Sequence, residues 1–417
     1  MTSNGKTPTD VVILSGARTP IGRFNGALAG VDAPHLGGVA IKAAVERAGI
    51  DPAEIEEVLM GQVVAAGSGQ APGRRAAIYA GLPAEVGASS VNKACGSGLK
   101  AVMFAAQAIR AGDADLIVAG GMENMSAAPY LVRARQGFKF GHQQLEDSVI
   151  VDGLWCSFEN WIMGNAAEFI ADEYEVTRAQ MDEFALASHQ KAIAAMEACR
   201  FKVEIAPVEI AGGQPRERGL RSGEGKGAGE KVTVIETDEG PRRDTSIDAL
   251  SRLKPAFKKD GKVTAGNAPG LNDGGAAVVV ASRRKAEQIG KAPLARIVGY
   301  AQAAVEPKWL FIAPARAIPK LLDKIGWTLK DVDLIEINEA FAAQVLADGR
   351  ALMDRGWDWG KVNVNGGAIA LGHPVGASGA RVLVTLMHAL KDRGLKRGIA
   401  TLCLGGGEAV ALAVELE

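Results

Sequence analysis

The sequence predicts an α/β fold built around a largely buried sheet. Apolar runs with the length of buried strands alternate with helical patterns along most of the 417 residues. Glycine accounts for 52 of the 417 residues, a larger share than the ~7% that is typical of proteins. The glycines gather between the apolar runs, where they indicate tight turns and close backbone approaches. Because the chain exceeds the usual size of one hydrophobic core, we expect at least two domains or two fused halves.

The expected elements follow from periodicity and run length. Six apolar runs predict buried strands at residues 10–17, 57–66, 114–121, 276–282, 334–338 and 398–407. Apolar residues at helical spacing predict helices at residues 37–50, 177–200 and 317–329.

Two segments repeat one pattern in the same order. Residues 89–124 pass from a strand through a glycine-rich turn, a helix and a second strand to a glycine-rich end, and residues 362–409 do the same. A duplicated α/β half explains this repeat and predicts a site where the halves meet. We therefore expect halves at residues 1–285 and 286–417, the first carrying an insertion at about 125–257, where the hydrophobic patterning weakens.

Charge and cysteine content exclude several classes of protein. Lys plus Arg number 47 and Asp plus Glu 48, so no net field attracts nucleic acid or an anionic membrane. The polar N-terminal stretch and the lack of a long apolar run predict a soluble, cytoplasmic protein with no membrane partner. The glycine-rich stretch 212–230 is expected to be a mobile surface loop that activity does not need. The four cysteines form no CxxC pair and are expected to be reduced thiols: Cys95, Cys156, Cys199 and Cys403.

Two glycine-rich stretches carry candidate reactive groups. In "VNKACGSGLKA", Cys95 lies between a predicted strand and a predicted helix, and the N–H groups at a helix start favour a thiolate. A small buried cysteine is the alternative. In "GGAIALGHPVGASGAR", Pro374 keeps His373 on a loop before a helix expected from about Ser378. Such a histidine suits a general base, and a structural turn histidine is the alternative.

Two further stretches carry polar groups at the ends of predicted strands. Cys403 ends a strand and is followed by Gly405 and two more glycines, whose N–H groups could bind an oxyanion. A buried strand cysteine before a turn is the alternative. Asn338 lies at a strand-to-helix junction in "EINEAFAAQ", where capping the helix is its plainest role.

Together these stretches resemble the thiolase family of acetyl-CoA C-acyltransferases. The matching motifs are "VNKACGSGLKA", "GGMENMS", "TAGNAPGLNDGGAA", "NEAFAAQ", "GHPVGASGAR" and "CLGGG", and they occur in the family's order over nearly the whole chain. The resemblance implies a five-layered αβαβα thiolase fold of two related halves, with an inserted loop domain that binds coenzyme A. It implies reversible condensation of two acetyl-CoA molecules to acetoacetyl-CoA and coenzyme A. Coenzyme A is then a substrate, no metal or cofactor is required, and the protein is a homo-oligomer, either a tetramer or a dimer.

The resemblance also implies roles for individual residues. By motif position, Cys95 resembles the acylated cysteine and His373 the base that takes its proton. Cys403 resembles the acid/base that moves a proton at the α-carbon of the second acetyl group. Asn338 would orient a water in an oxyanion hole shared with His373, and the N–H groups of Cys95 and Gly405 would form the other hole.

Contacts with coenzyme A and the acyl chain are implied for a second set of residues. Arg242 matches a residue near the adenine, and Pro269 stands where serine is frequent. The chain has Ile162 where the acetoacetyl-specific members often have histidine, and "LFIAP", with Leu310 and Phe311, where "MGTGP" or "MGIGP" is usual. The implied contact residues are Arg242, Pro269, Leu154, Met163 and Phe341.

These departures leave open which acyl-chain length the protein prefers, and other functions remain as alternatives. The alternatives are a longer-chain 3-ketoacyl-CoA thiolase, a non-catalytic acyl-CoA-binding relative, and a ketoacyl synthase, which would lack an equivalent of Cys403. A zinc site formed by Cys95, His373 and Cys403 is a further alternative.

Overall fold

One large mixed sheet organises the molecule. The computed structural model describes residues 7, 10–211 and 232–417, so the predicted loop 212–230 lies outside the described residues. All six predicted strands are present, although the one expected at 57–66 ends at Gly61. The sheet strands in the described chain are β1 (Val11–Arg18), β2 (Gly22–Arg23), β3 (Glu57–Gly61), β4 (Gly87–Val91), β5 (Leu116–Asn124), β12 (Asn272–Ser282), β13 (Ala295–Ala304), β14 (Leu334–Ile337), β15 (Arg397–Leu404) and β16 (Glu408–Leu416).

The strand order shows the duplication. The first half runs β4-β3-β5-β12-β1, and the second runs β14-β15-β16-β13. In each half, a long antiparallel centre is flanked by a parallel strand: β3 pairs with β5, and β14 with β15. Within the described sheet, the two halves pair where Val12 faces Arg296 and Ile13 faces Ala295. The order β3-β5-β12-β1 is thus repeated as β14-β15-β16-β13. The expected boundary between residues 285 and 286 lies within α7 (Arg283–Gln288) and stays a prediction.

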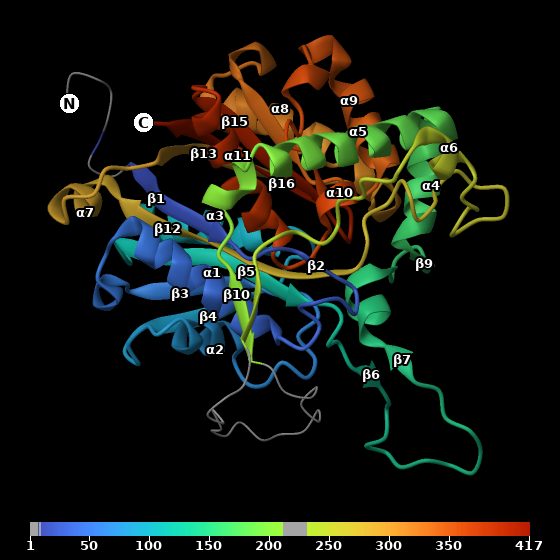
Figure 1. The fold of residues 1–417 in the computed structure, drawn as a ribbon, viewed down its shortest axis with the longest axis horizontal. Coiled ribbons are helices and arrows are strands. Elements are labelled where there is room, and N and C mark those ends of the chain that lie inside the picture. The colour runs from blue at the N-terminus through green and yellow to red at the C-terminus, as the bar shows by residue number, and fades with distance from the viewer. Residues whose placement is uncertain (1–6, 8–9, 212–231) are drawn as a thin grey trace.

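Helices cover both sheet halves and separate them. Helices α3 and α11 pack between the two half-sheets in one buried cluster with strands from both. Helices α1 and α2 cover the outer face of the first half, and α8 and α9 that of the second (Figure 1). This gives five layers in the order αβαβα, as predicted. The bounds are α1 (Ala33–Ala48), α2 (Pro72–Tyr79), α3 (Ser97–Ala111), α8 (Pro314–Ile325), α9 (Ala342–Leu352) and α11 (Ser378–Asp392).

The segment 125–257 contributes no strand to the large sheet within its described residues. Its long helix α5 crosses the second half, and β6 and β7 form the base of an arm that projects from the body (Figure 1). No helix in the described part of the chain has both the length and the hydrophobicity that crossing a membrane demands. The elements are β6 (Tyr130–Leu131), β7 (Glu146–Asp147), η2 (Val149–Leu154), β8 (Trp155–Cys156), β9 (Trp161–Ile162), α4 (Met163–Glu173), α5 (Arg178–Glu197), η3 (Arg200–Val203), β10 (Val208–Ala211), β11 (Val232–Ile235) and α6 (Ile247–Ser251).

Candidate active site

Cys95 lies at the apex of a tight turn between β4 and α3. Ala94 adopts a left-handed conformation with φ of 44°, which reverses the chain immediately before the cysteine. Ser97 fixes the turn, because its hydroxyl accepts from the Lys93 N–H at 2.8 Å and donates to the Ala94 carbonyl at 2.6 Å. The predicted placement of Cys95 between a strand and a helix is confirmed, and its side chain remains partly exposed.

The N–H groups near Cys95 favour the thiolate, as expected, but burial outweighs them. Burial is the largest influence and raises the pKa of the thiol to about 11. The N–H groups of Cys95 itself and of Gly405 favour the thiolate, whereas the charge of Glu123 opposes it. The two amide dipoles therefore do not outweigh desolvation, and Cys95 is a neutral thiol that needs a base when it attacks.

His373 is held as a neutral imidazole with one nitrogen available. Its Nδ1 lies 2.6 Å from the Ser378 hydroxyl, which in turn donates to the Pro374 carbonyl at 2.9 Å. The hydroxyl proton is thereby committed, so Nδ1 carries the hydrogen and Nε2 carries the lone pair. The backbone N–H of His373 donates to Asn272 Oδ1 at 2.9 Å. Burial, and then the charge of Arg381, lower the pKa of His373 to about 3, which leaves a neutral base.

Asn338 faces this nitrogen. Its Nδ2 lies 3.4 Å from His373 Nε2, which agrees with an unprotonated Nε2. Its Oδ1 is buried and finds no hydrogen-bond partner among the described residues. The capping role suggested by the sequence is wrong, because α9 begins at Ala342 and Phe341 takes the N-cap position. A fully buried amide with an unpaired oxygen is instead suited to bind a water or a substrate atom.

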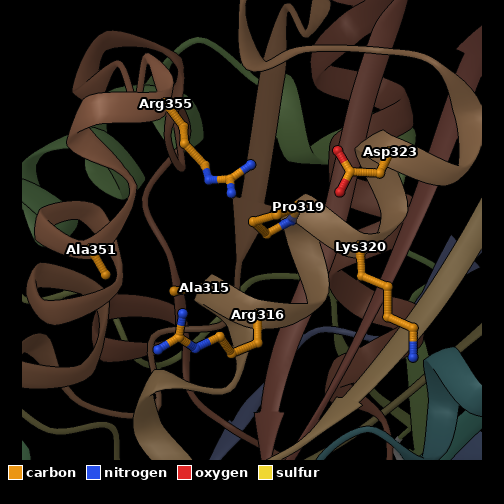
Figure 2. Close-up of a pocket in the computed structure, with 7 residues that line it drawn as sticks. All are labelled: Ala315, Arg316, Pro319, Lys320, Asp323, Ala351 and Arg355. Carbon is orange, nitrogen blue, oxygen red and sulfur yellow. The ribbon is translucent and has the colours of Figure 1, made fainter.

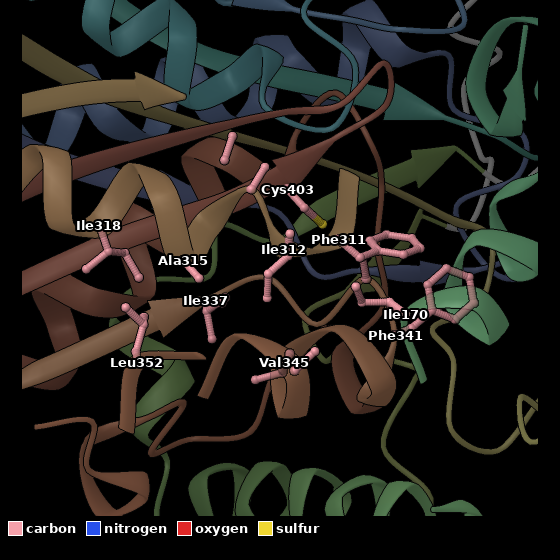
Figure 3. Packing of buried hydrophobic residues seen from close by; sticks show 14 of the residues in the cluster. Ile170, Phe311, Ile312, Ala315, Ile318, Ile337, Phe341, Val345, Leu352 and Cys403 are labelled. Atoms are coloured by element: carbon pink, nitrogen blue, oxygen red, sulfur yellow. The ribbon is translucent and has the colours of Figure 1, made fainter. Parts of the chain in front are cut away.

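Cys403 approaches the site from the second half. It lies next to the last residue of β15, with its side chain buried in the cluster that contains Phe311 and Phe341 (Figure 3). Burial, followed by the charge of Cys95, raises its pKa well above the usual range. Among the described residues, no group of three or more His, Cys, Asp and Glu side chains is arranged to hold a metal ion.

The glycine loop after Cys403 is tied to the Cys95 turn. A Cβ added at Gly405 would lie 3.6 Å from the Ala94 Cβ, which brings the loop beside the turn. Lys93 Nζ and a Glu408 carboxylate oxygen form an ion pair at 2.5 Å across the two halves. Gly406 and Gly407 have φ of 88° and 89°, which only glycine adopts freely. The Gly405 N–H is thereby directed at Cys95.

Two buried carboxyl groups, which the sequence analysis did not single out, hold neighbouring segments of the site together through hydrogen bonds. Glu123 accepts from the backbone N–H groups of Val63, Val64 and Gly376, and so joins the β3 end to the loop after His373. Glu339 accepts from the side chains of Ser188 and Asn363 and from the N–H of Ile369. Both belong to quoted motifs, "GGMEN" and "NEAF", which gave no indication of the partners.

Three of the five predicted coenzyme A contacts lie near the reactive groups. Leu154 packs with Cys95 in one small apolar cluster. Met163, at the start of α4, and Phe341 belong to the cluster that surrounds Cys403. These residues can therefore face a substrate that reaches both sulfur atoms.

The other two predicted contacts lie on connecting loops. Pro269 is partly buried between α6 and β12. Arg242 is exposed, and its backbone N–H donates to His189 on α5 at 3.2 Å. Among the described residues, no hydrogen bond, ion pair or apolar cluster joins Arg242 to the reactive groups. No contact in the structure thus assigns it to the site.

Two surface clefts are lined by none of the predicted site residues. A cleft of about 370 Å³ lies on α8, with Arg316 and Arg355 at its edge (Figure 2). A second, of about 460 Å³, separates α5 from α9 and has Glu339 among its lining residues.

The arrangement of two thiols, a neutral imidazole and a loop N–H suits acyl transfer through a cysteine, and comparison with known proteins agrees. The thiolase N-terminal domain model matches residues 11–284 and the thiolase C-terminal domain model residues 291–416. The chain therefore belongs to the thiolase family, and its fold is the thiolase fold.

The similar proteins share one name. The acetyl-CoA acetyltransferase of Pseudomonas aeruginosa is 54% identical over 404 residues, which cover 97% of this chain and 98% of that protein. The acetyl-CoA acetyltransferase of Cupriavidus necator is 55% identical over 408 residues, with 98% and 99% covered. The crystal structure of the Bacillus anthracis acetyl-CoA acetyltransferase matches with a TM-score of 0.90 and 44% identity, covering 98% of this chain and 99% of that one.

We predict that alkylation of Cys95 by iodoacetamide accelerates continuously from pH 7 to pH 10, because its pKa of about 11 keeps the thiolate a minor species throughout. Peptide mass spectrometry measures the rate, and exposed Cys199 serves as the internal reference. A rate that levels off below pH 8 would show that the protein stabilises the thiolate.

Proposed function

We propose that this chain catalyses the reversible Claisen condensation of two acetyl-CoA molecules to acetoacetyl-CoA and coenzyme A through an acyl group on Cys95. The observation that supports this proposal is that Asn338 lies beside His373, while Cys95 packs in one apolar cluster with Val375, two residues after His373. The shared name of the similar proteins supports the substrate assignment.

The first half-reaction loads the cysteine. His373 Nε2 takes the Cys95 proton as the sulfur attacks the acetyl thioester, and the proton then passes to the departing coenzyme A sulfur. The N–H groups of Cys95 and Gly405 face the carbonyl oxygen, whose negative charge grows in the tetrahedral adduct. A pKa near 3 makes His373 a weak base in the resting site, but the imidazolium gains a compensating anion when Cys95 ionises.

The second half-reaction forms the carbon–carbon bond. Cys403 first gives its proton to the neutral His373. The Cys403 thiolate then removes a proton from the α-carbon of the second acetyl-CoA, the enolate carbon attacks the acyl group, and the Cys95 thiolate that leaves takes the proton back from His373. A high pKa makes the Cys403 thiolate a strong base and, in the reverse direction, makes its thiol ready to return the proton. A water bound to Asn338, together with His373, would stabilise the enolate oxygen. These steps transfer only protons and acyl groups, with coenzyme A as substrate or product.

Coenzyme A is proposed to lie over Leu154, Met163 and Phe341, with Pro269 and Arg242 further along the molecule. A longer-chain 3-ketoacyl-CoA is the alternative substrate, which the same four reactive groups would cleave. A purely binding role is disfavoured, because the buried Asn338 oxygen has no partner among the described residues and a binding protein gains nothing from that cost.

The protein is also proposed to be a homo-oligomer. The arm between β6 and β7 carries apolar side chains that remain exposed in the single chain: Phe140 is fully exposed, and Phe138 and Leu145 are more than half exposed. Exposed apolar groups gathered on one projection favour contact with another copy of the chain.

We predict that acetyl-CoA alone acetylates Cys95. The expected result is a 1:1 acetyl adduct on the Cys95 peptide after acid quenching, measured by mass spectrometry, and its loss in Cys95→Ala. Cys199→Ala is the matched control and should load normally. A label on Cys403 in place of Cys95 would reverse the assigned roles.

We predict that Cys403→Ala still loads Cys95 but condenses about 100-fold or more slowly, since it lacks only the acid/base of the second half-reaction. Single-turnover acylation and acetoacetyl-CoA formation are measured separately. If the variant acylates as poorly as Cys95→Ala, the division of labour is wrong.

We predict that a Phe138→Ser, Phe140→Ser double variant forms a smaller assembly than the unaltered protein in light scattering, because it removes the apolar contact surface of the arm. Phe158→Ser changes a phenylalanine that is 72% exposed outside the arm and is the control. An unchanged mass for the double variant would exclude the arm from assembly.

A further inference from the structure

We propose that Phe311, packed against Phe341, forms the closed end of the acyl pocket and restricts the enzyme to the shortest 3-ketoacyl chains. This inference rests on the proposed function and adds the substrate class.

The location of Phe311 is fixed by its element. It lies in the short helix η4 (Pro307–Ile312), which packs against β15, β16, α4 and α9. Just before η4, the N–H of Val305 donates to the Gly407 carbonyl at 2.7 Å. Thus η4 is anchored to the glycine loop that follows Cys403, and its side chains cannot move independently of that loop.

The two rings form a rigid wall. Phe311 is 2% exposed and Phe341 9%, and their ring centroids lie 5.3 Å apart with planes at 66°. Phe257 packs edge-on against the other side of Phe341 at 6.3 Å. Figure 3 shows the rings of Phe311 and Phe341 together beside the end of β15 that carries Cys403, within one buried cluster. An edge-to-face pair held by a third ring has little freedom to yield to a ligand.

The chemistry determines where the acyl chain must begin. Cys403 has to reach the α-carbon, and Cys95 bonds to the neighbouring keto carbon, so the substituent on the keto carbon starts one bond away from the carbon that Cys95 attacks. In acetoacetyl-CoA this substituent is a methyl group. Each longer chain adds methylenes at the same point, where Phe311 and Phe341 occupy the apolar space around Cys403.

The expected preference among acyl-chain lengths follows from how strongly an apolar pocket can distinguish substrates that differ by a few methylenes. One additional methylene changes specificity by about 10-fold to 200-fold in a pocket of fixed shape. We therefore expect kcat/KM to fall by at least about 10-fold from acetoacetyl-CoA to 3-ketohexanoyl-CoA, and further to 3-ketooctanoyl-CoA. Removal of the Phe311 ring should selectively restore the longer substrates.

The test compares Phe311→Leu and Phe311→Ala with the unaltered protein on these three substrates, with coenzyme A as the second substrate. We expect the C6-to-C4 ratio of kcat/KM to rise by about 10-fold in Phe311→Ala, with a smaller rise in Phe311→Leu. Phe201→Leu is the matched control: Phe201 is 3% exposed in a separate cluster with Ile21 and Ala192, so its loss should leave the ratio unchanged. Thermal unfolding of each variant separates lost folding from altered specificity.

Three results would overturn the proposal. In the first, the unaltered protein cleaves the C8 substrate as readily as the C4 substrate. In the second, the Phe311 variants fold but keep the original C6-to-C4 ratio of kcat/KM. In the third, this ratio changes in the Phe311 variants by no more than it does in Phe201→Leu. Failure of the proposed function has a different signature, because Cys95 would then accept no acetyl group and no chain length would be cleaved.

Discussion

The site depends on the close contact between the first turns of α3 and α11. A Cβ added at Gly379 would lie 2.3 Å from the Leu99 backbone nitrogen, and one at Gly98 would lie 2.8 Å from the Ala380 nitrogen. Only glycine permits this approach from either side. Because one reactive group precedes each helix by a few residues, bringing the two helix starts together brings the two halves' chemistry together. The duplication thus supplies a site where the two halves meet, with the thiol from one half and the imidazole from the other.

Burial at this junction sets the protonation states. The pKa of Cys95 rises and that of His373 falls, so a neutral thiol faces a neutral imidazole. In low dielectric, separated charges are costly unless they form beside one another. Proton transfer between the two creates a paired thiolate and imidazolium only when the substrate is present to use them. The same reasoning applies to Cys403, because burial raises its pKa well above the usual range.

Sequence patterns predicted the α/β alternation, the strands and the turn positions of Cys95 and His373, because periodicity and glycine placement act locally. The five layers were expected only from the resemblance to the thiolase family. They did not predict the high pKa of Cys95, since desolvation depends on the opposite half of the molecule. The roles of Glu123 and Glu339 could also not be predicted from the sequence. Glu123 accepts from N–H groups about 60 residues before it and about 250 after it, and no spacing rule connects such partners. The N-cap interpretation of Asn338 failed because the chain continues for three residues before α9 begins.

The proposed catalytic groups and the proposed chain-length determinant lie on different parts of the fold. The reactive groups lie on turns that both halves share by duplication, and these turns are held by glycine contacts that tolerate no larger side chain. Phe311 lies on η4, a connection between β13 and α8, and contacts the site through ring packing alone. Under this proposal, a change at Phe311 would alter the shape of the pocket without replacing any residue of the Ser378–His373 hydrogen bond. Chain-length preference can therefore vary among proteins of this fold while the acid/base geometry stays fixed.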